Sequence, residues 1–194
     1  MSISLVAGLG NPGRDYVSTR HNVGWVVIDA FAHKLGLVWK SHPPFAAEIA
    51  RWDRPGVATV HFVKPLTFMN ESGTAVNAVA RYYKIPPTSV VAIYDDLTID
   101  LGLVKVSVSG SAGGHNGVAS LLQQLGDGFI RYRIGIGPKH PPQMDLKDFV
   151  LGKFTPDQQT LVTQQLVQYL SGLDLLLSRG SEAAMNQLNR REPK

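Results

Sequence analysis

Two kinds of apolar pattern alternate along this chain, and the alternation constrains its fold more than any other feature. Short apolar or alternating runs predict β-strands, and stretches with apolar side chains three or four residues apart predict amphipathic helices. The expected strands cover 3–7, 46–52, 57–63, 90–94, 104–108 and 132–136, and the expected helices cover 22–35, 75–83, 116–125, a long stretch from 155–156 through 177, and 182–188. This interleaving predicts an α/β fold in which helices surround a twisted β-sheet.

One turn indicates that the sheet is mixed rather than purely parallel. The residues Asp53-Arg54-Pro55-Gly56 favour a tight turn and separate two expected strands, so these strands should form an antiparallel hairpin. The other strands are joined through helices, as parallel strands are. No internal repeat or low-complexity linker interrupts the sequence, and we expect one domain over residues 1–194.

The composition narrows the function classes. The chain has no cysteine, which excludes a disulfide framework, thiolate metal ligands and a cysteine nucleophile, and which fits a reducing cytosol. Its 19 Lys and Arg residues against 15 Asp and Glu give a net charge of +4, which permits a polyanionic partner without requiring one. The sequence has neither the start of a signal peptide nor the roughly 20 apolar residues of a membrane span. We therefore expect a soluble, cytoplasmic protein.

Gly8, Gly10 and Gly13 have the spacing of a dinucleotide-binding fingerprint directly after an expected strand. In such a site, the third glycine lies inside a helix whose N-terminus binds the pyrophosphate. Here the residues after Gly13 prolong the loop, and the helical pattern waits until Val23. The context therefore favours a tight turn over nucleotide binding. A second glycine-rich stretch, 110–117, lacks the G-K-[ST] ending of a phosphate-binding loop.

Side chains suited to hydrolysis gather beside strand ends and helix starts. His21 lies between the first glycine-rich loop and a helix, Asp95 follows a strand, and Asn11, Asn70 and Asn116 occupy similar positions. A histidine can activate water, a carboxylate can fix its tautomer, and amides can bind carbonyl oxygens, so this set could cleave an activated ester. Each asparagine alone is more often a cap or turn residue. The six histidines lack zinc-protease spacing, so we expect no metal site and assign most of them to the surface or to packing.

Six blocks of sequence occur in order along nearly the whole chain. They are VAGLGNPG with Tyr16 and TRHNVG, KPLTFMN with Ser72-Gly73, DDL, GGHNG, RYRIGIG and FVLGKF. Together they resemble the bacterial-type peptidyl-tRNA hydrolase family. The resemblance implies a cofactor-free enzyme that cleaves the ester between a peptide's C-terminal carboxyl and the 3′-terminal ribose of tRNA, so that stalled peptidyl-tRNA is recycled.

The resemblance also implies roles for the catalytic residues. His21 would be the general base that takes a proton from water, and Asp95 would hold its imidazole in the tautomer able to accept that proton. Asn11 would distinguish a blocked α-amine from a free one, since its amide could meet a peptide N–H. We also expect a monomer.

Further residues would bind the substrate. The resemblance places Tyr16, Phe68, Asn70 and Asn116 around the peptide and the tRNA 3′ end, and it places Lys105 and Arg133 against phosphates of the acceptor stem. Two positions depart from the family pattern. Ser107 stands where lysine is frequent, which leaves the phosphate clamp less complete, and Thr98 stands where a further acid is usual.

Two other functions stay open at this point. A catalytically idle relative could bind RNA only, although the presence of both His21 and Asp95 argues against it. A nucleotide-dependent oxidoreductase has only the three glycines in its favour. Turnover of peptidyl-tRNA without metal or nucleotide separates these possibilities. Finally, the Pro-rich polar segment 138–147 predicts a mobile lid beside the site.

Overall fold

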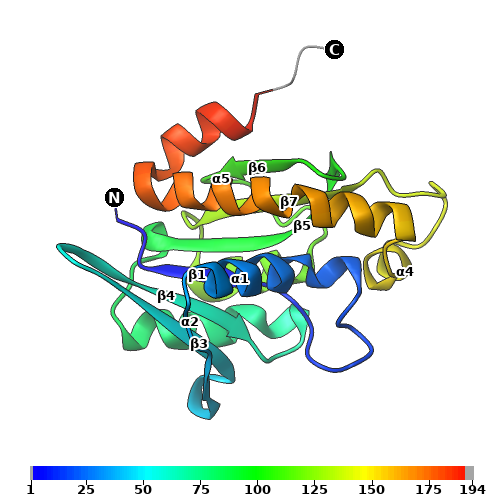
Figure 1. Cartoon of the computed structure of the whole chain (residues 1–194). Helices are drawn as coiled ribbons and strands as arrows, with labels where there is room; N and C mark the ends of the chain where they lie inside the picture. Colours follow the sequence, from blue (N-terminus) through cyan, green and yellow to red (C-terminus); the bar gives the residue numbers. More distant parts are fainter. Residues whose placement is uncertain (1, 191–194) are drawn as a thin grey trace.

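The computed structural model describes residues 2–190, which form one sheet between two layers of helices (Figure 1). The strands are β1 Leu5–Gly8, β2 Lys40–His42, β3 Ala47–Arg54, β4 Val57–Pro65, β5 Val90–Asp100, β6 Val104–Ser107 and β7 Ile130–Gly137. The helices are α1 Val23–Lys34, α2 Ser72–Tyr82, α3 Asn116–Leu125, α4 Leu146–Leu151 and α5 Pro156–Leu188, with short 3-10 turns η1 Arg20–Asn22, η2 Pro43–Phe45, η3 Met69–Glu71 and η4 Pro87–Ser89.

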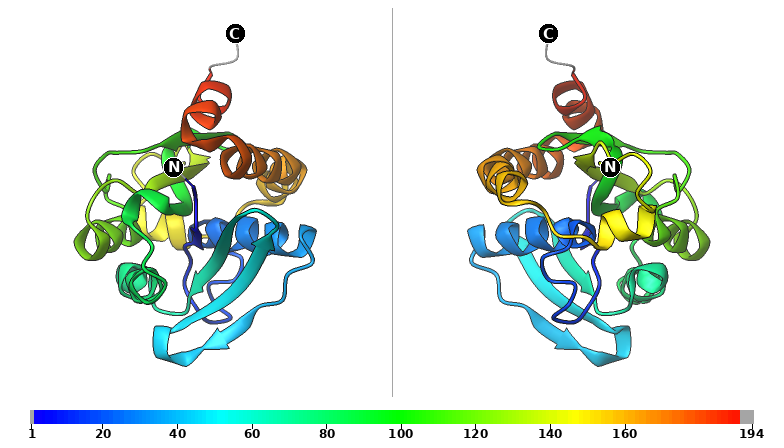
Figure 2. Two further views of the ribbon diagram at one scale, coloured as in Figure 1. Left: turned by 90° about the vertical axis from the view of Figure 1, so that its left-hand side faces the viewer. Right: turned by 90° about the vertical axis from the view of Figure 1, so that its right-hand side faces the viewer.

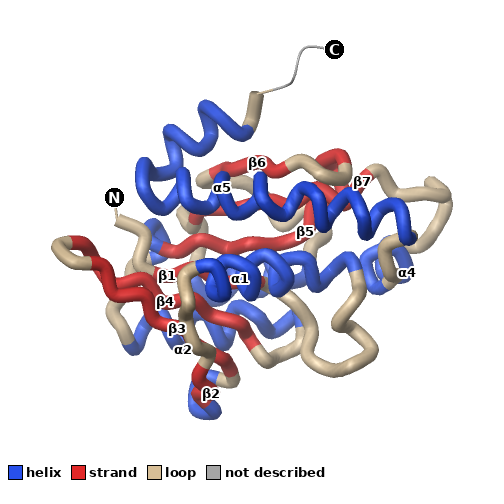
Figure 3. The backbone as a smooth tube through the Cα atoms, viewed as in Figure 1, coloured by secondary structure: helices blue, strands red, loops and turns tan. Residues whose placement is uncertain are grey.

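The sheet is mixed, as the sequence predicted. Its strand order is β2-β3-β4-β1-β5-β7-β6 (Figure 3). The four central strands β4, β1, β5 and β7 run parallel. β3 and β6 flank them in the antiparallel direction, and β2 pairs antiparallel with β3 at the outer edge. The predicted α/β class is therefore confirmed, whereas the predicted domain bounds reach past the described residues and stay a prediction.

Alternation along the central strands divides the core into two layers, because successive side chains of a strand point to opposite faces. Val6 on β1 packs with residues of α1 and α5, whereas Leu5 and Ala7 pack with residues of α2 and α3. The views along the sheet in Figure 2 show these two layers of helices on its two sides. Burial on both faces explains why the central strands read as nearly continuous apolar runs.

Most predicted elements are present, and the differences have local causes. β2 and α4 were not predicted, because three and six residues are too few to show a period. The side chain of Asp145 caps α4 by accepting from the N–H of Lys147 at 2.8 Å. The two helices predicted after Thr155 are parts of α5, which is broken at Gly180, where φ is +83°.

β5 is longer than predicted, and this difference shapes the site. The sequence placed Asp95 and Asp96 after a strand that ended at Tyr94, but both lie within β5 and pair with β7. On its other side, the last residue that β5 pairs with β1 is Ile93, opposite Gly8. Beyond Ile93, β5 continues without β1 beside it. The next residues of β5, from Tyr94 to Thr98, line the cleft described below.

The end of α5 returns to the sheet at its outer strand β6. The residue after α5, Asn189, accepts at Oδ1 from the N–H of Val106 and donates from Nδ2 to the carbonyl oxygen of Val106, both at 2.8 Å. One side-chain amide thus occupies both backbone hydrogen-bonding groups of a residue in the middle of β6.

Candidate active site

A cleft of about 890 Å³ opens where the loop after β1, the far part of β5 and the loop before α3 meet. Eight of the nine predicted site residues line it: Asn11, Tyr16, His21, Phe68, Asn70, Asp95, Asn116 and Arg133. Lys105, the ninth, lies outside the cleft lining. The carboxyl ends of parallel strands are where α/β proteins commonly build sites.

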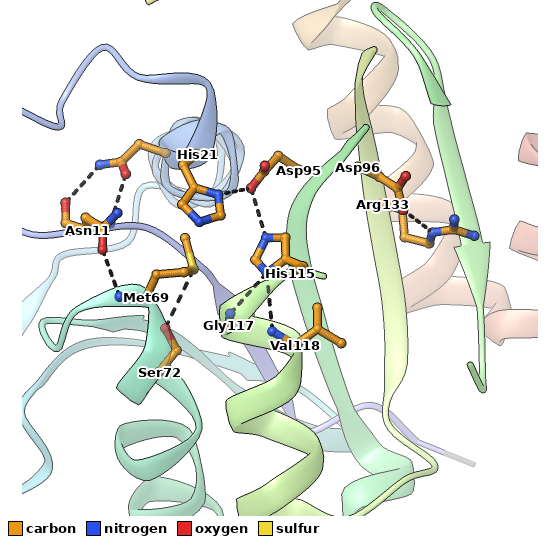
Figure 4. A network of polar contacts seen from close by, with 11 residues as sticks. Asn11, His21, Met69, Ser72, Asp95, Asp96, His115, Gly117, Val118 and Arg133 are labelled. Atoms are coloured by element: carbon orange, nitrogen blue, oxygen red, sulfur yellow. Dashed lines mark hydrogen bonds and ion pairs between the residues drawn. The ribbon is translucent and has the colours of Figure 1, made fainter. Parts of the chain in front are cut away.

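His21 and Asp95 form a buried pair at the base of this cleft. His21 belongs to η1 and is 6% exposed, and Asp95 belongs to β5 and is 3% exposed. Nδ1 of His21 lies 2.7 Å from Oδ1 of Asp95 (Figure 4). Burial alone would raise the pKa of Asp95, but the two neighbouring imidazoles, His115 and His21, hold it well below its usual range. The ionised carboxylate therefore accepts a proton-bearing Nδ1, and Nε2 of His21 keeps its lone pair, as a general base requires.

His115 is a second histidine on the same carboxylate, and no role was predicted for it from the sequence. Its Nε2 lies 3.0 Å from Oδ1 of Asp95, and its Nδ1 accepts from the N–H groups of Gly117 and Val118 at 3.1 and 3.3 Å (Figure 4). These contacts make His115 the N-cap of α3 and fix its tautomer, with the proton on Nε2. Its position directly before a predicted helix was the available signal, although histidine is not among the favoured caps.

His21, Asp95 and His115 offer three ligand atoms within 4.8 Å of one another, which is compatible in distance with a metal site. The positions of the ring protons of the two histidines favour a hydrogen-bonded cluster over a metal site. Nδ1 of His115 already accepts two backbone N–H groups, so Nε2 carries the proton and has no lone pair for a cation. The Nδ1 of His21 likewise donates to Asp95. The cluster is therefore suited to orienting a base.

Asn11 is held in the loop after β1 by contacts that fix the direction of its amide. Its backbone N–H donates to Oδ1 of Asn22 at 2.8 Å, and Nδ2 of Asn22 donates to the carbonyl oxygen of Asn11 at 2.9 Å. The side-chain Oδ1 of Asn11 accepts from the N–H of Met69 at 2.8 Å. The group left for a substrate is therefore Nδ2, a donor. This favours a substrate carbonyl oxygen as its partner, rather than the peptide N–H considered from the sequence.

The glycines of the fingerprint serve close packing. A Cβ at Gly8 would lie 2.6 Å from Cγ2 of Ile28, and one at Gly10 would lie 2.7 Å from Cγ of Trp25. Both contacts are with α1, which begins at Val23, well after the glycine loop. A dinucleotide-binding loop would instead lead directly into the helix whose N-terminus binds the pyrophosphate. The structure agrees with the interpretation of this loop as a tight turn.

Aromatic and amide side chains form the wall beside the pair. The rings of Tyr16 and Phe68 meet edge to face with centroids 6.2 Å apart, and Phe68 is 53% exposed. Asn70 lies in η3 and Asn116 is the first residue of α3, so both amides sit at the starts of helical segments that border the cleft. An exposed aromatic edge with amides nearby suits a peptide or a nucleobase.

The two predicted phosphate ligands are neighbours across strands. Lys105 on β6 and Arg133 on β7 lie directly opposite each other, so their side chains share one face of the sheet. Nε of Arg133 donates to Oδ2 of Asp96 at 2.8 Å, and the hydroxyl of Thr98 donates to Oδ1 of Asp96 at 2.6 Å. Asp96 therefore balances part of the Arg133 charge, and Thr98 is a partner of this ion pair.

The positive charge that is absent at Ser107 is not supplied by its cross-strand neighbour. Arg131 lies opposite Ser107, but it is 2% exposed and donates to the backbone carbonyl oxygens of Gly110 and Ser111. Its guanidinium is thus committed to the loop before α3. Arg131 therefore does not replace a lysine at position 107, and the binding of phosphates by Lys105 and Arg133 stays a prediction.

Part of the predicted lid borders the cleft. Asp145, Leu146 and Lys147 line it together with Val150 and Leu151, so α4 supplies one wall. The predicted mobility of 138–147 stays a prediction. Across residues 2–190, the structure contains no helix with both the length and the apolar character needed to span a lipid bilayer.

Comparison with known proteins matches the whole arrangement. The sequence profile of one family, described as peptidyl-tRNA hydrolase, matches residues 5–194. The peptidyl-tRNA hydrolase of Gloeobacter violaceus is 40% identical over 192 residues, covering 98% of this chain and 96% of the relative. That of Lactiplantibacillus plantarum is 38% identical over 188 residues, covering 96% and 100%.

A solved structure agrees with the sequence relatives. The crystal structure of peptidyl-tRNA hydrolase from Acinetobacter baumannii superimposes with a TM-score of 0.89 at 35% identity, covering 99% of this chain and 97% of that one. The similarity in fold therefore extends over nearly the whole of both chains.

Proposed function

This chain belongs to the peptidyl-tRNA hydrolase family, whose members are hydrolases acting on the ester bond of peptidyl-tRNA, and we propose that its His21–Asp95 pair activates the attacking water. The observation that carries this proposal is the 2.7 Å contact between Nδ1 of His21 and the buried carboxylate of Asp95. It leaves Nε2 of His21 as the acceptor.

Water is the proposed nucleophile because the pair lacks a side-chain one. A serine or threonine nucleophile would be hydrogen-bonded to the base. Within residues 2–190, the hydrogen-bonding partner of the His21 ring is Asp95, and no hydroxyl group contacts it. A base with no side-chain nucleophile can take its proton from water.

The reaction then has two proton transfers. As the water oxygen attacks the ester carbonyl carbon, one water proton passes to Nε2 of His21, and Asp95 stabilises the imidazolium. When the tetrahedral intermediate collapses, the bond to the ribose 3′ oxygen breaks and the imidazolium returns the proton to that oxygen. The products are a peptide carboxylic acid, which ionises in water, and tRNA with a free 3′ hydroxyl.

The amides supply donors for carbonyl oxygens. Nδ2 of Asn11 is left free by the Met69 contact, and Asn70 and Asn116 border the same cleft. We assign Asn11 to a peptide carbonyl of the bound substrate, and Asn70 and Asn116 to the remaining polar groups around the ester. Tyr16 and Phe68 would pack against the peptide or the terminal base of the tRNA.

The tRNA acceptor stem would approach from the side of Lys105 and Arg133. They are the partly exposed cations of this face of β6 and β7, where Arg131 is buried, and phosphate contacts of this kind position a nucleic acid without reading its sequence. The modest net charge of +4 fits such a local patch.

The test is hydrolysis of N-acetyl-aminoacyl-tRNA with a chelator present and no nucleotide added. We expect multiple turnovers, one ¹⁸O atom in the released carboxylate when the solvent is H₂¹⁸O, and no burst of tRNA ahead of the acyl product. A burst would indicate an acyl-enzyme and contradict water attack. Binding without turnover would instead indicate a protein that only binds RNA.

A further inference from the structure

Arg20 directly precedes His21 in η1, and its side chain reaches away from the cleft into the protein. It is 8% exposed. Nη1 donates to the carbonyl oxygen of Phe149 at 3.1 Å, and Nη2 donates to Oε1 of Gln158 at 3.0 Å. The guanidinium carbon also lies 4.4 Å from the centroid of the Phe149 ring. One side chain thus joins the turn that carries His21 to the end of α4 and the first turn of α5.

This cation is buried without an acidic partner. The ion pairs found within residues 2–190 do not include Arg20, and its Nε has no hydrogen-bonding partner there. Burial lowers the pKa of Arg20 from its ordinary value, which reflects the unfavourable loss of hydration. Well-packed apolar side chains can often replace buried ionic groups with no loss of stability. An arginine here is therefore a poor choice for stability alone.

The two acceptors do not depend on Arg20. The carbonyl oxygen of Phe149 also accepts from the N–H of Gly152 at 3.2 Å, and Oε1 of Gln158 also accepts from the N–H of Thr155 at 3.1 Å. A methionine at position 20 would leave neither oxygen unpaired and could pack on the Phe149 ring. Arg20 is therefore not needed to provide hydrogen bonds for these two acceptor oxygens.

Their geometry points instead to orientation. α4 and α5 are anchored independently, because Phe149 and Tyr169 are buried in the apolar core. The turn η1 is short, and its other link to this side is the isolated bridge between Thr19 and Lys153, which includes the 3.0 Å bond from the N–H of Arg20 to the carbonyl oxygen of Gly152. Loss of the guanidinium would loosen the turn and leave the helices in place.

We infer that Arg20 is a positioning residue for the reaction: its two divergent hydrogen bonds fix η1 so that Nε2 of His21 faces the ester. The inference rests on the proposed role of His21 as the base. A planar guanidinium can bind two acceptors in fixed directions, which neither lysine nor an apolar side chain can do. A displacement of about 1 Å at a reacting group can reduce the rate by about a hundredfold.

The decisive variant is Arg20→Met, compared with the matched control Arg14→Met. Arg14 is exposed in the preceding loop and does not line the cleft. For Arg20→Met we expect kcat on N-acetyl-aminoacyl-tRNA to fall by about tenfold to a hundredfold, KM to change by less than about twofold, and the unfolding temperature to stay near that of the wild type. The control should keep the wild-type kcat.

A second readout reports on the His21 ring itself. In ¹⁵N NMR of the wild-type protein, the imidazole should show the Nδ1–H tautomer, and in Arg20→Met its ring nitrogens should move toward values averaged over both tautomers. Gln158→Leu, which removes one acceptor, should lower kcat in the same direction and by less. It provides the test if Arg20→Met does not fold.

The outcomes separate this inference from the proposed function. A wild-type protein that does not hydrolyse the substrate contradicts the proposed function. If the wild type is active, a wild-type kcat and an unchanged tautomer in Arg20→Met overturn the inference. If Arg20→Met does not fold, a wild-type kcat in Gln158→Leu, or a loss of its activity that only follows a loss of folded protein, overturns the inference as well.

Discussion

Replacing Asp95 with asparagine removes the negative charge beside His21 and keeps the size of the side chain. The carboxylate is 3% exposed, and its Oδ1 lies 2.7 Å from Nδ1 of His21. When His21 takes a proton from water, two unit charges about 4 Å apart attract by about 4 kcal/mol at an effective dielectric constant of about 20. Since about 1.36 kcal/mol corresponds to a tenfold change in rate, Asp95→Asn should lower kcat by roughly 10³.

The measurement is single-turnover hydrolysis of N-acetyl-aminoacyl-tRNA by the wild type, His21→Ala, Asp95→Asn and the double variant. His21→Ala should cost on the order of 10²–10⁴. Because the two residues share one task, the double variant should be little slower than the slower single one. Asp100→Asn, an exposed position of the same strand outside the cleft, is the matched control and should keep the wild-type rate.

Circular dichroism should show that all of these variants keep the fold. Fully additive losses would mean that Asp95 acts separately from His21, for example by binding substrate. An active His21→Ala enzyme would refute the proposed mechanism.

Neutralising Lys105 or Arg133 should each reduce the slope of log affinity for tRNA against log salt by about 0.9, measured by filter binding; unchanged slopes would place the phosphate contacts elsewhere. N-acetyl-aminoacyl-tRNA should be cleaved much faster than the free aminoacyl form, because Nδ2 of Asn11 needs an acyl carbonyl oxygen. For the same reason the α-hydroxyacyl form should be cleaved slowly. Fast cleavage of the α-hydroxyacyl form would mean that the site only rejects an ammonium group. Burial lowers the pKa of His61; Arg51 adds to the shift and Asp53 opposes it. Below about pH 6.5 the unfolded state therefore binds more protons than the folded state. The free energy of unfolding should fall as the pH drops from there toward the folded-state pKa. Urea unfolding of His61→Phe should show a weaker loss over that range, and an unchanged pH dependence would remove His61 as its source.

The sequence was informative where structure depends on neighbours along the chain. The helical spacing and glycine-rich flanks of α3 predicted residues 116–125, which are the observed bounds. The meeting of His21 and Asp95 was implied by the family resemblance. It also agreed with the placement of His21 before a helix and of Asp95 after a strand, since an α/β fold brings such loops together at one edge of its sheet. Their hydrogen bond is the central feature of the site.

Other features depend on contacts between distant segments. His115 reaches Asp95 from a loop in which Gly113 and Gly114 adopt positive φ angles of 56° and 82°, and no periodicity encodes such a loop. The length of β5 depends on its pairing with β7, and the ion pair of Arg133 with Asp96 depends on that register. The monomeric state, the cytoplasmic location and the mobility of the lid stay predictions.

The contacts of the Asn189 amide determine where the chain can be shortened without promoting aggregation. β6 is an outer strand, and outer strands offer free backbone groups on which another chain can add a strand and begin to aggregate. By occupying the N–H and the carbonyl oxygen of Val106, Asn189 blocks such addition at the middle of this four-residue strand. A chain shortened before residue 189 would keep every residue of the cleft but would expose the unpaired backbone groups of β6. Such a chain should aggregate although its catalytic residues are all present.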